Sequence, residues 1–436
     1  MLEPLYTAAE MRAAEAGHDV AALMERAGRA VADEALRRFP DARSFGGVCG
    51  GGANGGDARI ALEALKAAGR RAEEGLQGDV LIDGLFGTGF RGEPRPETAE
   101  LIEAVNARGV PVVAVDLPSG VNADTGEIEG AAVRADVTVT MHGPKVGLAV
   151  APGRFHAGEV VVADIGLEPA ETEHRLVGKE ILELVPRKRA GDNKYSAGAV
   201  LVFGGAPGLT GAACLAAEAA FRADAGYVTV AAPRESLPVL ETRLLEAVKR
   251  PLEEAFDAAG RSGALAIGPG LGREPEKQAL VRRLLEEVEL PAVVDADGLF
   301  GLEPFERSAA TVLTPHAGEL GRLLGQDSEW VSAHRLEAAR RGAEHFGCVC
   351  LLKGADTIVA APGGGVLVVG LGPPSLATAG TGDVLTGVVA AFLAKGLDAR
   401  PAAAAGAAAC SIAASLGPAR GLVASDVVAL LPRALG

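Results

Sequence analysis

The chain has 436 residues, more than one ordinary domain holds, and we predict two folded domains. Its 48% apolar and 23% charged residues exclude a disordered protein. A formal net charge of −15 without any basic run excludes nucleic acid as a partner, because binding to a phosphate backbone depends on clustered lysine and arginine. An anionic ligand would have to bind at local features such as glycine-rich loops and helix N-termini.

The cysteines and the apolar segments predict a cytoplasmic protein that does not bind membranes. The five cysteines are scattered and form no CxxC pair, so neither disulfide bonds nor structural zinc is indicated. Charged residues interrupt the first 17 positions, so no signal peptide is expected. Residues 401–419 carry no charge, but alanine and glycine supply little transfer energy. This segment is therefore predicted to be a helix buried in a protein core.

The N-terminal half alternates helical segments with short apolar runs. Thr7 and Glu10 have the spacing of a capping box, which predicts a helix over residues 8–16. A second, amphipathic helix follows and ends near Arg38. Further helices are expected over residues 57–68 and 97–107. This rhythm predicts βαβ units with a parallel sheet. We place this domain at residues 1–170, with a linker near 167–177.

Three loops of this half carry residues suited to a ligand site. The segment CGGGANGGDA (49–58) lies between a predicted strand and a helix, where backbone N–H groups can approach a phosphate. Taken alone, it could equally be a tight strand-to-helix turn. Two later strands end on Asp83 and Asp116, and each is followed by a glycine-containing loop. Because the carboxyl ends of parallel strands meet at one edge, we expect the three loops to converge.

The ordered segments CGGGANGGD, DGLFGTGFRGE and VDLPSG, with LMERAG upstream, resemble the NAD(P)HX epimerase family over residues 1–170. The resemblance implies a Rossmann-like three-layer αβα domain and a potassium ion held by Asn54, Asp83 and Ser119. It implies that the hydrated nicotinamide nucleotide contacts Asp116 and two loops, namely Ala53, Asn54, Gly55, Gly56 and Asp57, and Gly87, Thr88, Gly89, Phe90, Arg91, Gly92 and Glu93. Asp116 is the candidate catalytic acid or base at the epimerised carbon.

The chain departs from this family's pattern in two ways. The family reads N-N-G-G-D-G where this chain has Ala53 and Ala58 at the ends of the motif. Only 25 residues, 58 to 82, separate Asp57 from Asp83, and they hold one helix followed by the charged segment RRAEEGLQG. Family members have an additional strand there. We therefore expect a shortened sheet, and a non-catalytic binding or oligomerisation module is the alternative interpretation of this half.

The C-terminal half, residues 176–436, contains a second series of short apolar runs that predicts another α/β domain. Its strongest motif is ATAGTGDVLTG (377–387), which leads into an apolar helix. Backbone N–H groups of residues 379–382 would form an anion nest, with Asp383 in the first helical turn. A carboxylate beside a bound phosphate suits a base that deprotonates an attacking hydroxyl. Alternatively, Asp383 only caps the helix.

The companion segments NKYSAG, VLVFGGAPGLTGAA, GPGLG, VDADGL, LTPHAGE and KGADT, together with AGTGD, resemble the ADP- or ATP-dependent NAD(P)HX dehydratase of the ribokinase-like superfamily. The resemblance implies a ribokinase-like αβα fold, catalysis by Asp383, Mg²⁺ on the phosphates, and ADP as the expected donor. The nucleotide would contact Lys353, Gly354, Ala355, Asp356, Thr357 and Gly382. The hydrated dinucleotide would contact Ala212, Gly270, His316 and Asp383.

Two of these assignments have structural alternatives. His316 follows a strand end and could merely satisfy backbone groups rather than contact a ligand. Asp295 and Asp297 alternate along a predicted strand end, so only one of them is expected to face the site.

The sequence therefore predicts a bifunctional repair enzyme that epimerises R- and S-NAD(P)HX and dehydrates the S form to NAD(P)H. With ADP as donor, AMP and phosphate are the other products. We also expect a homo-oligomer. The alternative is a ribokinase-like kinase of a vitamin precursor, such as a hydroxyethylthiazole or a hydroxymethylpyrimidine, with a non-catalytic N-terminal half.

Overall fold

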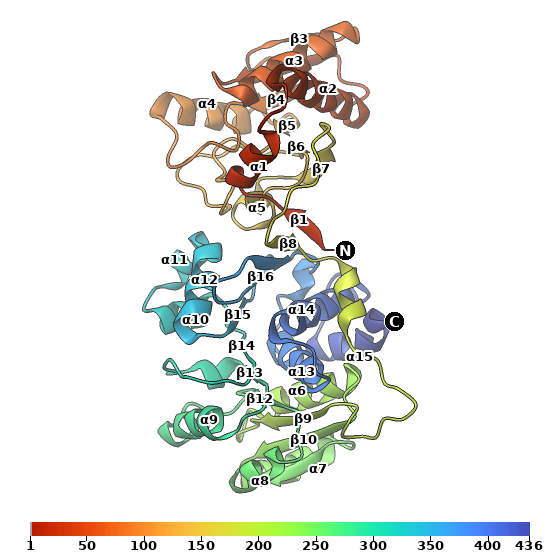
Figure 1. Cartoon of the computed structure of the whole chain (residues 1–436), viewed down its shortest axis with the longest axis vertical. Coiled ribbons are helices and arrows are strands. Elements are labelled where there is room, and N and C mark those ends of the chain that lie inside the picture. Colours follow the sequence, from red (N-terminus) through yellow and green to blue (C-terminus); the bar gives the residue numbers. More distant parts are fainter. Residues whose placement is uncertain (1) are drawn as a thin grey trace. The chain divides into compact units, whose positions relative to one another are not determined.

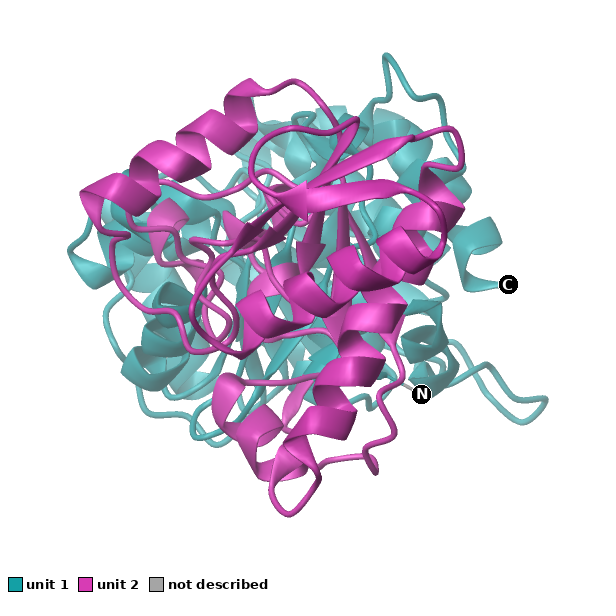
Figure 2. Ribbon diagram, turned by 90° about the horizontal axis from the view of Figure 1, so that it is seen from above, with its two compact units in different colours: residues 1–3, 175–331, 336–436 teal, residues 4–174, 332–335 magenta. Residues whose placement is uncertain are grey.

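The computed structural model describes residues 2–436 and divides into two compact units. The N-terminal unit comprises residues 4–174 together with residues 332–335. The C-terminal unit is formed mainly by residues 175–331 and 336–436. Figure 2 colours the two units separately, and each is an α/β structure around a mainly parallel sheet.

The N-terminal unit is built on a six-stranded parallel sheet in the order β3-β2-β4-β5-β6-β7 (Figure 1). Its strands are β2 (Ser44–Cys49), β3 (Arg71–Glu74), β4 (Val80–Gly84), β5 (Val112–Val115), β6 (Val137–Met141) and β7 (Glu159–Ala163). Its helices are α1 (Ala8–Glu15), α2 (Val20–Arg38), α3 (Ala53–Ala67), α4 (Pro96–Ala107) and α5 (Val146–Ala149).

The first two helices begin and end where local chemistry predicts. Thr7 caps α1, and its side chain and that of Glu10 form the reciprocal bonds of a capping box. Asp19 caps α2 by accepting from the N–H groups of Ala21 and Ala22. The helix then ends at Arg38, so both of these sequence predictions are confirmed.

Helices cover both faces of this sheet. Ile82 and Val113 pack in a cluster with Val31 of α2 and Leu62 of α3. The neighbouring Leu81 points to the other face, in a cluster that contains Ile102 of α4. Successive residues of a strand point to opposite faces, so this alternation defines two helical layers around one sheet. The Rossmann-like three-layer architecture is thereby confirmed.

The charged segment before Asp83 forms a strand after all. We expected no strand between the glycine-rich helix and β4, yet β3 pairs in parallel with β2 through residues 71–74. Ala72 is buried, and Arg59 of α3 forms an ion pair with Glu74, with Nε 2.8 Å from Oε1. The sequence did not predict this strand because most of its residues are charged. A short edge strand needs only one buried side chain on its inner face, so it lacks the apolar pattern of an inner strand.

The C-terminal unit contains most of an eleven-stranded sheet in the order β1-β8-β17-β16-β15-β14-β13-β12-β9-β10-β11. Its strands are β1 (Glu3–Leu5), β8 (His174–Leu176), β9 (Ala199–Phe203), β10 (Tyr227–Ala232), β11 (Val248–Pro251), β12 (Ala264–Ile267), β13 (Ala292–Val294), β14 (Thr311–Leu313), β15 (Val349–Leu352), β16 (Thr357–Ala360) and β17 (Val366–Val369). Strand β16 runs antiparallel to both of its neighbours.

The helices along this part of the chain are α6 (Thr210–Arg222), α7 (Leu237–Arg243), α8 (Ala255–Ala259), α9 (Pro275–Glu287), α10 (Ala317–Leu324), α11 (Ser328–Ala333), α12 (Arg335–Phe346), α13 (Thr381–Ala394), α14 (Ala399–Ser415) and α15 (Ala424–Leu435). One core cluster joins Val200 and Val202 of β9 to α6, α13 and α14. Another joins Leu201 and Phe203 to α8 and α9 on the opposite face.

The uncharged alanine-rich segment forms helix α14. Twelve of its residues are buried, from Ala402 to Ala414, which confirms the prediction of a core helix. Over residues 2–436, the structure contains no helix with both the length and the hydrophobicity of a membrane span.

Candidate functional site

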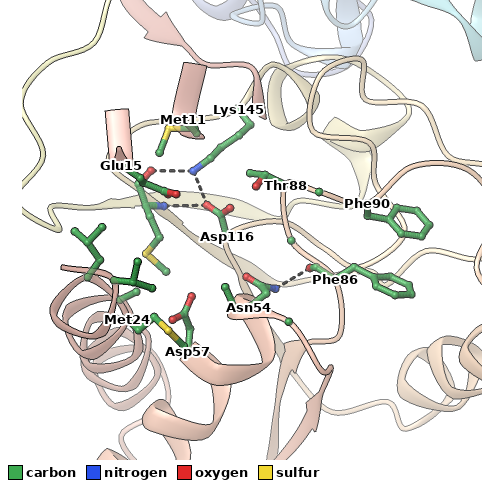
Figure 3. Close-up of a pocket in the computed structure, with 18 of the residues that line it drawn as sticks. Met11, Glu15, Met24, Asn54, Asp57, Phe86, Thr88, Phe90, Asp116 and Lys145 are labelled. Atoms are coloured by element: carbon green, nitrogen blue, oxygen red, sulfur yellow. Dashed lines mark hydrogen bonds and ion pairs between the residues drawn. The ribbon is translucent and has the colours of Figure 1, made fainter. Parts of the chain in front are cut away.

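The carboxyl edge of the N-terminal sheet borders a cavity of about 690 Å³. Its walls come from the end of α1, the start of α2, the first turn of α3, the loop after β4, and the ends of β5 and β6. Figure 3 shows Asn54, Asp57, Asp116 and Lys145 around this space. The three predicted loops therefore converge at one edge of the sheet, as we expected.

The helix after the glycine-rich segment begins earlier than predicted. It was expected over residues 57–68, whereas α3 begins at Ala53, after Gly52 in an extended conformation. The glycines permit this early start because the backbones approach closely. A Cβ atom on Gly55 would lie 2.0 Å from the carbonyl oxygen of Gly50. Asn54 and Asp57 therefore project from the first two turns of a helix rather than from a loop.

The structure brings only part of the predicted nucleotide contacts to the cavity. The lining includes Ala53, Asn54, Asp57, Asp116 and the loop residues Gly87, Thr88, Gly89, Phe90 and Arg91. Gly55 and Gly56 pack against Gly50 and Met24 instead. Glu93 lies beside Gly130, and neither it nor Gly92 lines the cavity.

Asn54, Asp83 and Ser119, the three predicted potassium ligands, lie together. The Ser119 hydroxyl donates to Asp83 Oδ1 at 2.6 Å and accepts from the Phe86 N–H at 2.9 Å. The Asn54 amide nitrogen donates to the carbonyl oxygen of the same Phe86, at 2.7 Å. Burial raises the pKa of Asp83 to about 6, against the lowering effect of its hydrogen bonds from Ser119. A carboxylate buried among neutral donors, with amide, hydroxyl and carbonyl oxygens around it, fits a monovalent cation.

Asp116 forms a buried ion pair with Lys145. Lys145 is fully buried, and its ammonium group lies 2.5 Å from Asp116 Oδ1 and 2.8 Å from the carbonyl oxygen of Met141. The same carboxylate oxygen accepts from the N–H of Met141 and the hydroxyl of Thr140, each at 3.1 Å. Asp116 has a left-handed φ of +64°, a conformation that Asp tolerates better than most residues. These contacts fix its carboxylate at the cavity wall.

In the C-terminal unit, Asp383 lies in the first turn of α13, as predicted. The helix follows Gly380, which has a φ of +89°. Burial raises the pKa of Asp383 to about 7, and Asp295 adds to this effect while Lys353 opposes it. A carboxyl group with this pKa can accept a proton near neutral pH.

A buried network lies beside Asp383. Lys353 Nζ is 2.7 Å from Asp295 Oδ1, and the Thr386 hydroxyl of α13 donates to Asp295 Oδ2 at 2.8 Å. Burial by itself would lower the pKa of Lys353, but Asp295 and Glu319 raise it overall. The network therefore keeps a cation close to the first turn of α13.

The expectation for Asp295 and Asp297 was wrong. Asp297 does not continue the strand, because residues 296–299 form a 3₁₀ turn after β13. Its carboxylate accepts from the N–H of Gly272 at 3.0 Å and pairs with Arg273. Both carboxylates nevertheless raise the pKa of Asp383, so both lie on the side of the site.

The remaining predicted contacts come from the β15–β16 turn, the loop after β12, and the first turns of α6 and α13. Lys353, Gly354, Ala355 and Asp356 form the turn between β15 and β16, and Thr357 begins β16. A Cβ atom on Gly382 would lie 3.4 Å from Lys353 Nζ, and one on Gly270 would lie 3.2 Å from Ala212. Both predicted ligand sets are thus placed around the same sheet edge.

His316 has the capping role that was the alternative to ligand contact. Its Nδ1 accepts from the N–H groups of Gly318 and Glu319 at the start of α10. Glu319 completes a capping box through the N–H of His316. Nε2 of the ring lies 3.5 Å from Glu319 Oε1, and the side chain is otherwise largely exposed. Capping and ligand contact are therefore compatible.

Sequence reasoning missed the partners of the site residues. Lys145, Glu15 and Thr386 were not singled out, and Asp295 was not paired with Lys353. One signal was present for Lys145, which follows the apolar run VTVTM and precedes VGLAV, so it lies in a segment that is buried throughout. A lysine in such a segment requires a carboxylate.

Two mainly parallel sheets, each with glycine-rich loops and a buried acid at its carboxyl edge, are typical of an α/β enzyme that binds small molecules. The family model described as NAD(P)H-hydrate dehydratase matches residues 200–433. The model described as YjeF-related protein N-terminus matches residues 20–74 and 68–147.

Bifunctional NAD(P)H-hydrate repair enzymes are similar to the chain over most of its length. The relative from Moorella thermoacetica is 39% identical over 87% of this chain and 79% of its own. The relative from Coxiella burnetii is 36% identical over 96% of this chain and 95% of its own. The chain belongs to the family of bifunctional NAD(P)H-hydrate repair enzymes.

Solved structures resemble the C-terminal unit. An ADP/ATP-dependent NAD(P)H-hydrate dehydratase from Bacillus subtilis, co-crystallised with ATP and Mg²⁺, is 28% identical with a TM-score of 0.54. The match covers 59% of this chain and 96% of that chain. A ribokinase-like superfamily protein from Enterococcus faecalis is 25% identical with a TM-score of 0.53, over 62% and 97% of the two chains. The ribokinase-like fold is thereby confirmed.

The comparisons also bear on the shortened N-terminal sheet. The alignment with the Coxiella relative spans 467 positions, more than the 436 residues of this chain, so that relative has residues that this chain lacks. The N-terminal family model matches in two pieces that meet at residues 68–74, the segment of β3. The two pieces of the family model therefore overlap in the segment that contains β3.

Proposed function

We propose that this enzyme restores hydrated NADH and NADPH, with the epimerase reaction in the N-terminal unit and the dehydratase reaction in the C-terminal unit. The observation that carries the proposal is Asp383, a half-buried acid in the first turn of α13, with a pKa raised to about 7, beside the Lys353–Asp295 pair. In the proposed reaction Asp383 accepts the proton of the C6 hydroxyl as that oxygen attacks the terminal phosphoryl group of ADP or ATP. Phosphate then leaves C6 and a proton leaves C5, and the C5=C6 double bond of the dihydropyridine ring is restored.

The nucleotide would bind along the β15–β16 turn and the start of α13, through Lys353, Gly354, Ala355, Asp356, Thr357 and Gly382. The dinucleotide would contact Ala212, Gly270, His316 and Asp383. Mg²⁺ would accompany the phosphates and reduce their negative charge. Crystallisation of the Bacillus subtilis relative with ATP and Mg²⁺ supports this part of the proposal.

The direct test is recovery of the near-ultraviolet absorbance of NADH from S-NADHX. We expect recovery that depends on ADP or ATP, and its absence with both nucleotides would contradict the dehydratase proposal. A kinase of a vitamin precursor is less well supported, because the full-length relatives are repair enzymes. Net ADP formation from ATP with a stable hydroxymethyl substrate would favour that alternative.

In the N-terminal unit, we propose Asn54, Asp83 and Ser119 as ligands of a potassium ion and Asp116 as a catalytic residue. The ion would neutralise the buried Asp83 and hold the loop after β4. We expect Asp116→Asn to abolish R-to-S exchange of NADHX, because the variant loses the fixed carboxylate. Exchange should also fall when sodium replaces potassium. Chromatography of the two epimers without ADP measures both effects.

Dehydratase activity of the same preparations provides the control for folding. If Asp116→Asn exchanges the epimers at the wild-type rate, Asp116 is not catalytic. If the wild-type protein itself shows no exchange, the N-terminal unit is a non-catalytic module. We further propose that the enzyme acts in the cytoplasm as a homo-oligomer, which sedimentation equilibrium would test.

A further inference from the structure

Asp57 is a buried acid that lines the N-terminal cavity. It takes no part in the hydrogen bonds described above for Asp83 and Asp116. It projects from the start of the second turn of α3 and lines the cavity together with Asp116, which comes from the end of β5 (Figure 3). Only 9% of the residue is exposed. A glycine on each helix, Gly28 and Gly56, lets α2 approach α3 closely at this point.

One oxygen of Asp57 has no partner. Within residues 2–436, Oδ1 is buried and accepts no hydrogen bond. Leaving such an atom unsatisfied is unfavourable, so folded proteins rarely retain one without a role. Because Asp57 borders the cavity, a ligand is the natural source of the missing hydrogen bond.

The two acids of the cavity differ in their surroundings. Asp116 is paired with Lys145 and accepts two further hydrogen bonds. Burial raises the pKa of Asp57 to about 7, and the nearby Asp116 and Glu15 add to the increase. The one ammonium group in this wall, that of Lys145, is bound to Asp116. Met24 and Leu23 of α2 add only apolar surface on the other side.

We propose that Asp57 is a second catalytic residue of the epimerase site, acting as the acid while Asp116 acts as the base. This inference rests on the proposed epimerase function. Asp116 is paired with an ammonium group, whereas Asp57 has an oxygen without a partner, and two carboxyl groups in such different surroundings are a recurring acid and base arrangement.

The proposed step is balanced with water as the only other reactant. Asp57 donates its proton to the C6 hydroxyl, the C6–O bond breaks, and the N1 lone pair forms the C6=N1 bond as water leaves. A water molecule then bonds to C6 from the opposite face and gives a proton to Asp116, and the electron pair returns to N1. Exchange with solvent restores the starting protonation of both acids.

The test compares the wild-type enzyme with Asp57→Asn and with Asp33→Asn, a matched control at an exposed position of α2. R-NADHX is the substrate, ADP is omitted, and the enzyme-free rate is subtracted at each pH. We expect Asp57→Asn to lower kcat for exchange about 100-fold, the usual contribution of a positioned acid. Wild-type kcat should fall as pH rises through about 7, and this decrease should be absent from Asp57→Asn.

Thermal unfolding gives a readout that does not depend on turnover. A carboxyl with a folded-state pKa of about 7 and an unfolded value near 3.8 destabilises the fold progressively as pH rises between these values. The Tm of Asp57→Asn minus that of the wild type should therefore increase from about pH 4 to about pH 7 and then level off. Asp33→Asn should show no such trend.

The outcomes separate this inference from the proposed function. If the wild-type enzyme exchanges the epimers and Asp57→Asn matches its kcat and pH profile, Asp57 is not the acid. If the wild-type enzyme shows no exchange although dehydration is intact, the epimerase function itself fails. Dehydratase activity retained by Asp57→Asn shows that the variant is folded.

Discussion

Replacing Asp383 with asparagine is expected to lower kcat for nucleotide-dependent dehydration by about 10³-fold, within the range for removal of a general base. The amide cannot accept the proton of the C6 hydroxyl. In the wild-type enzyme the base is active when deprotonated, and its pKa is raised to about 7 by burial and by Asp295. We therefore expect kcat to rise with pH up to about 7 and then to level off.

Two controls accompany this variant. Asp398→Asn removes the same charge at an exposed position before α14, where the side chain makes no capping bond, and it should behave as the wild type. R-to-S exchange in the N-terminal unit should be unchanged in both variants. If Asp383→Asn retained wild-type kcat, the residue would be a helix-capping group and the assignment of the base would be wrong.

Replacing Lys353 with methionine should reduce the free energy of unfolding of the C-terminal unit by about 3–5 kcal/mol, because it leaves the Asp295 carboxylate buried without its counterion. Lys353 also lowers the pKa of Asp383, so the midpoint of any residual pH profile should move above 7. Urea denaturation and the pH dependence of residual dehydratase activity measure the two effects.

A double variant distinguishes the ion pair from the loss of side-chain volume. Adding Asp295→Asn to Lys353→Met removes the unpaired charge, so we expect part of the stability to return. Activity should stay low, because the cation beside the first turn of α13 is still missing. Strictly additive losses of stability in the two single variants would show that the pair is not coupled.

The fold was largely predictable because most of its elements follow from local patterns. The capping box at Thr7 and the apolar stripe of α2 predicted two helices almost to the residue. Burial of α14 followed from its composition alone. Strand β3 escaped prediction because its residues, Arg71 to Glu74, are mostly charged, and its pairing partner lies 27 positions earlier in the chain.

The loops that form the candidate sites could be predicted from the sequence, but the ion pairs between their side chains could not. Resemblance and strand-end position indicated Asp83, Asp116 and Asp383. The cations that face two carboxylates lie far along the chain, since Lys145 is 29 residues from Asp116 and Lys353 is 58 residues from Asp295. No periodicity connects such pairs. The pKa of a carboxyl group depends on such contacts and on burial, so the raised pKa of Asp57 could not be predicted from the sequence.

The strand at the end of the N-terminal sheet also affects how this unit can meet other chains. Strand β3 is at the end of the sheet and bonds only to β2, so its outer backbone groups are available for strand addition. Arg71, Glu73 and Glu74 are exposed along this strand. Charged side chains on a short terminal strand discourage edge-to-edge aggregation. The charges of β3 thus oppose pairing of this edge with a second copy of the chain, although its backbone is accessible.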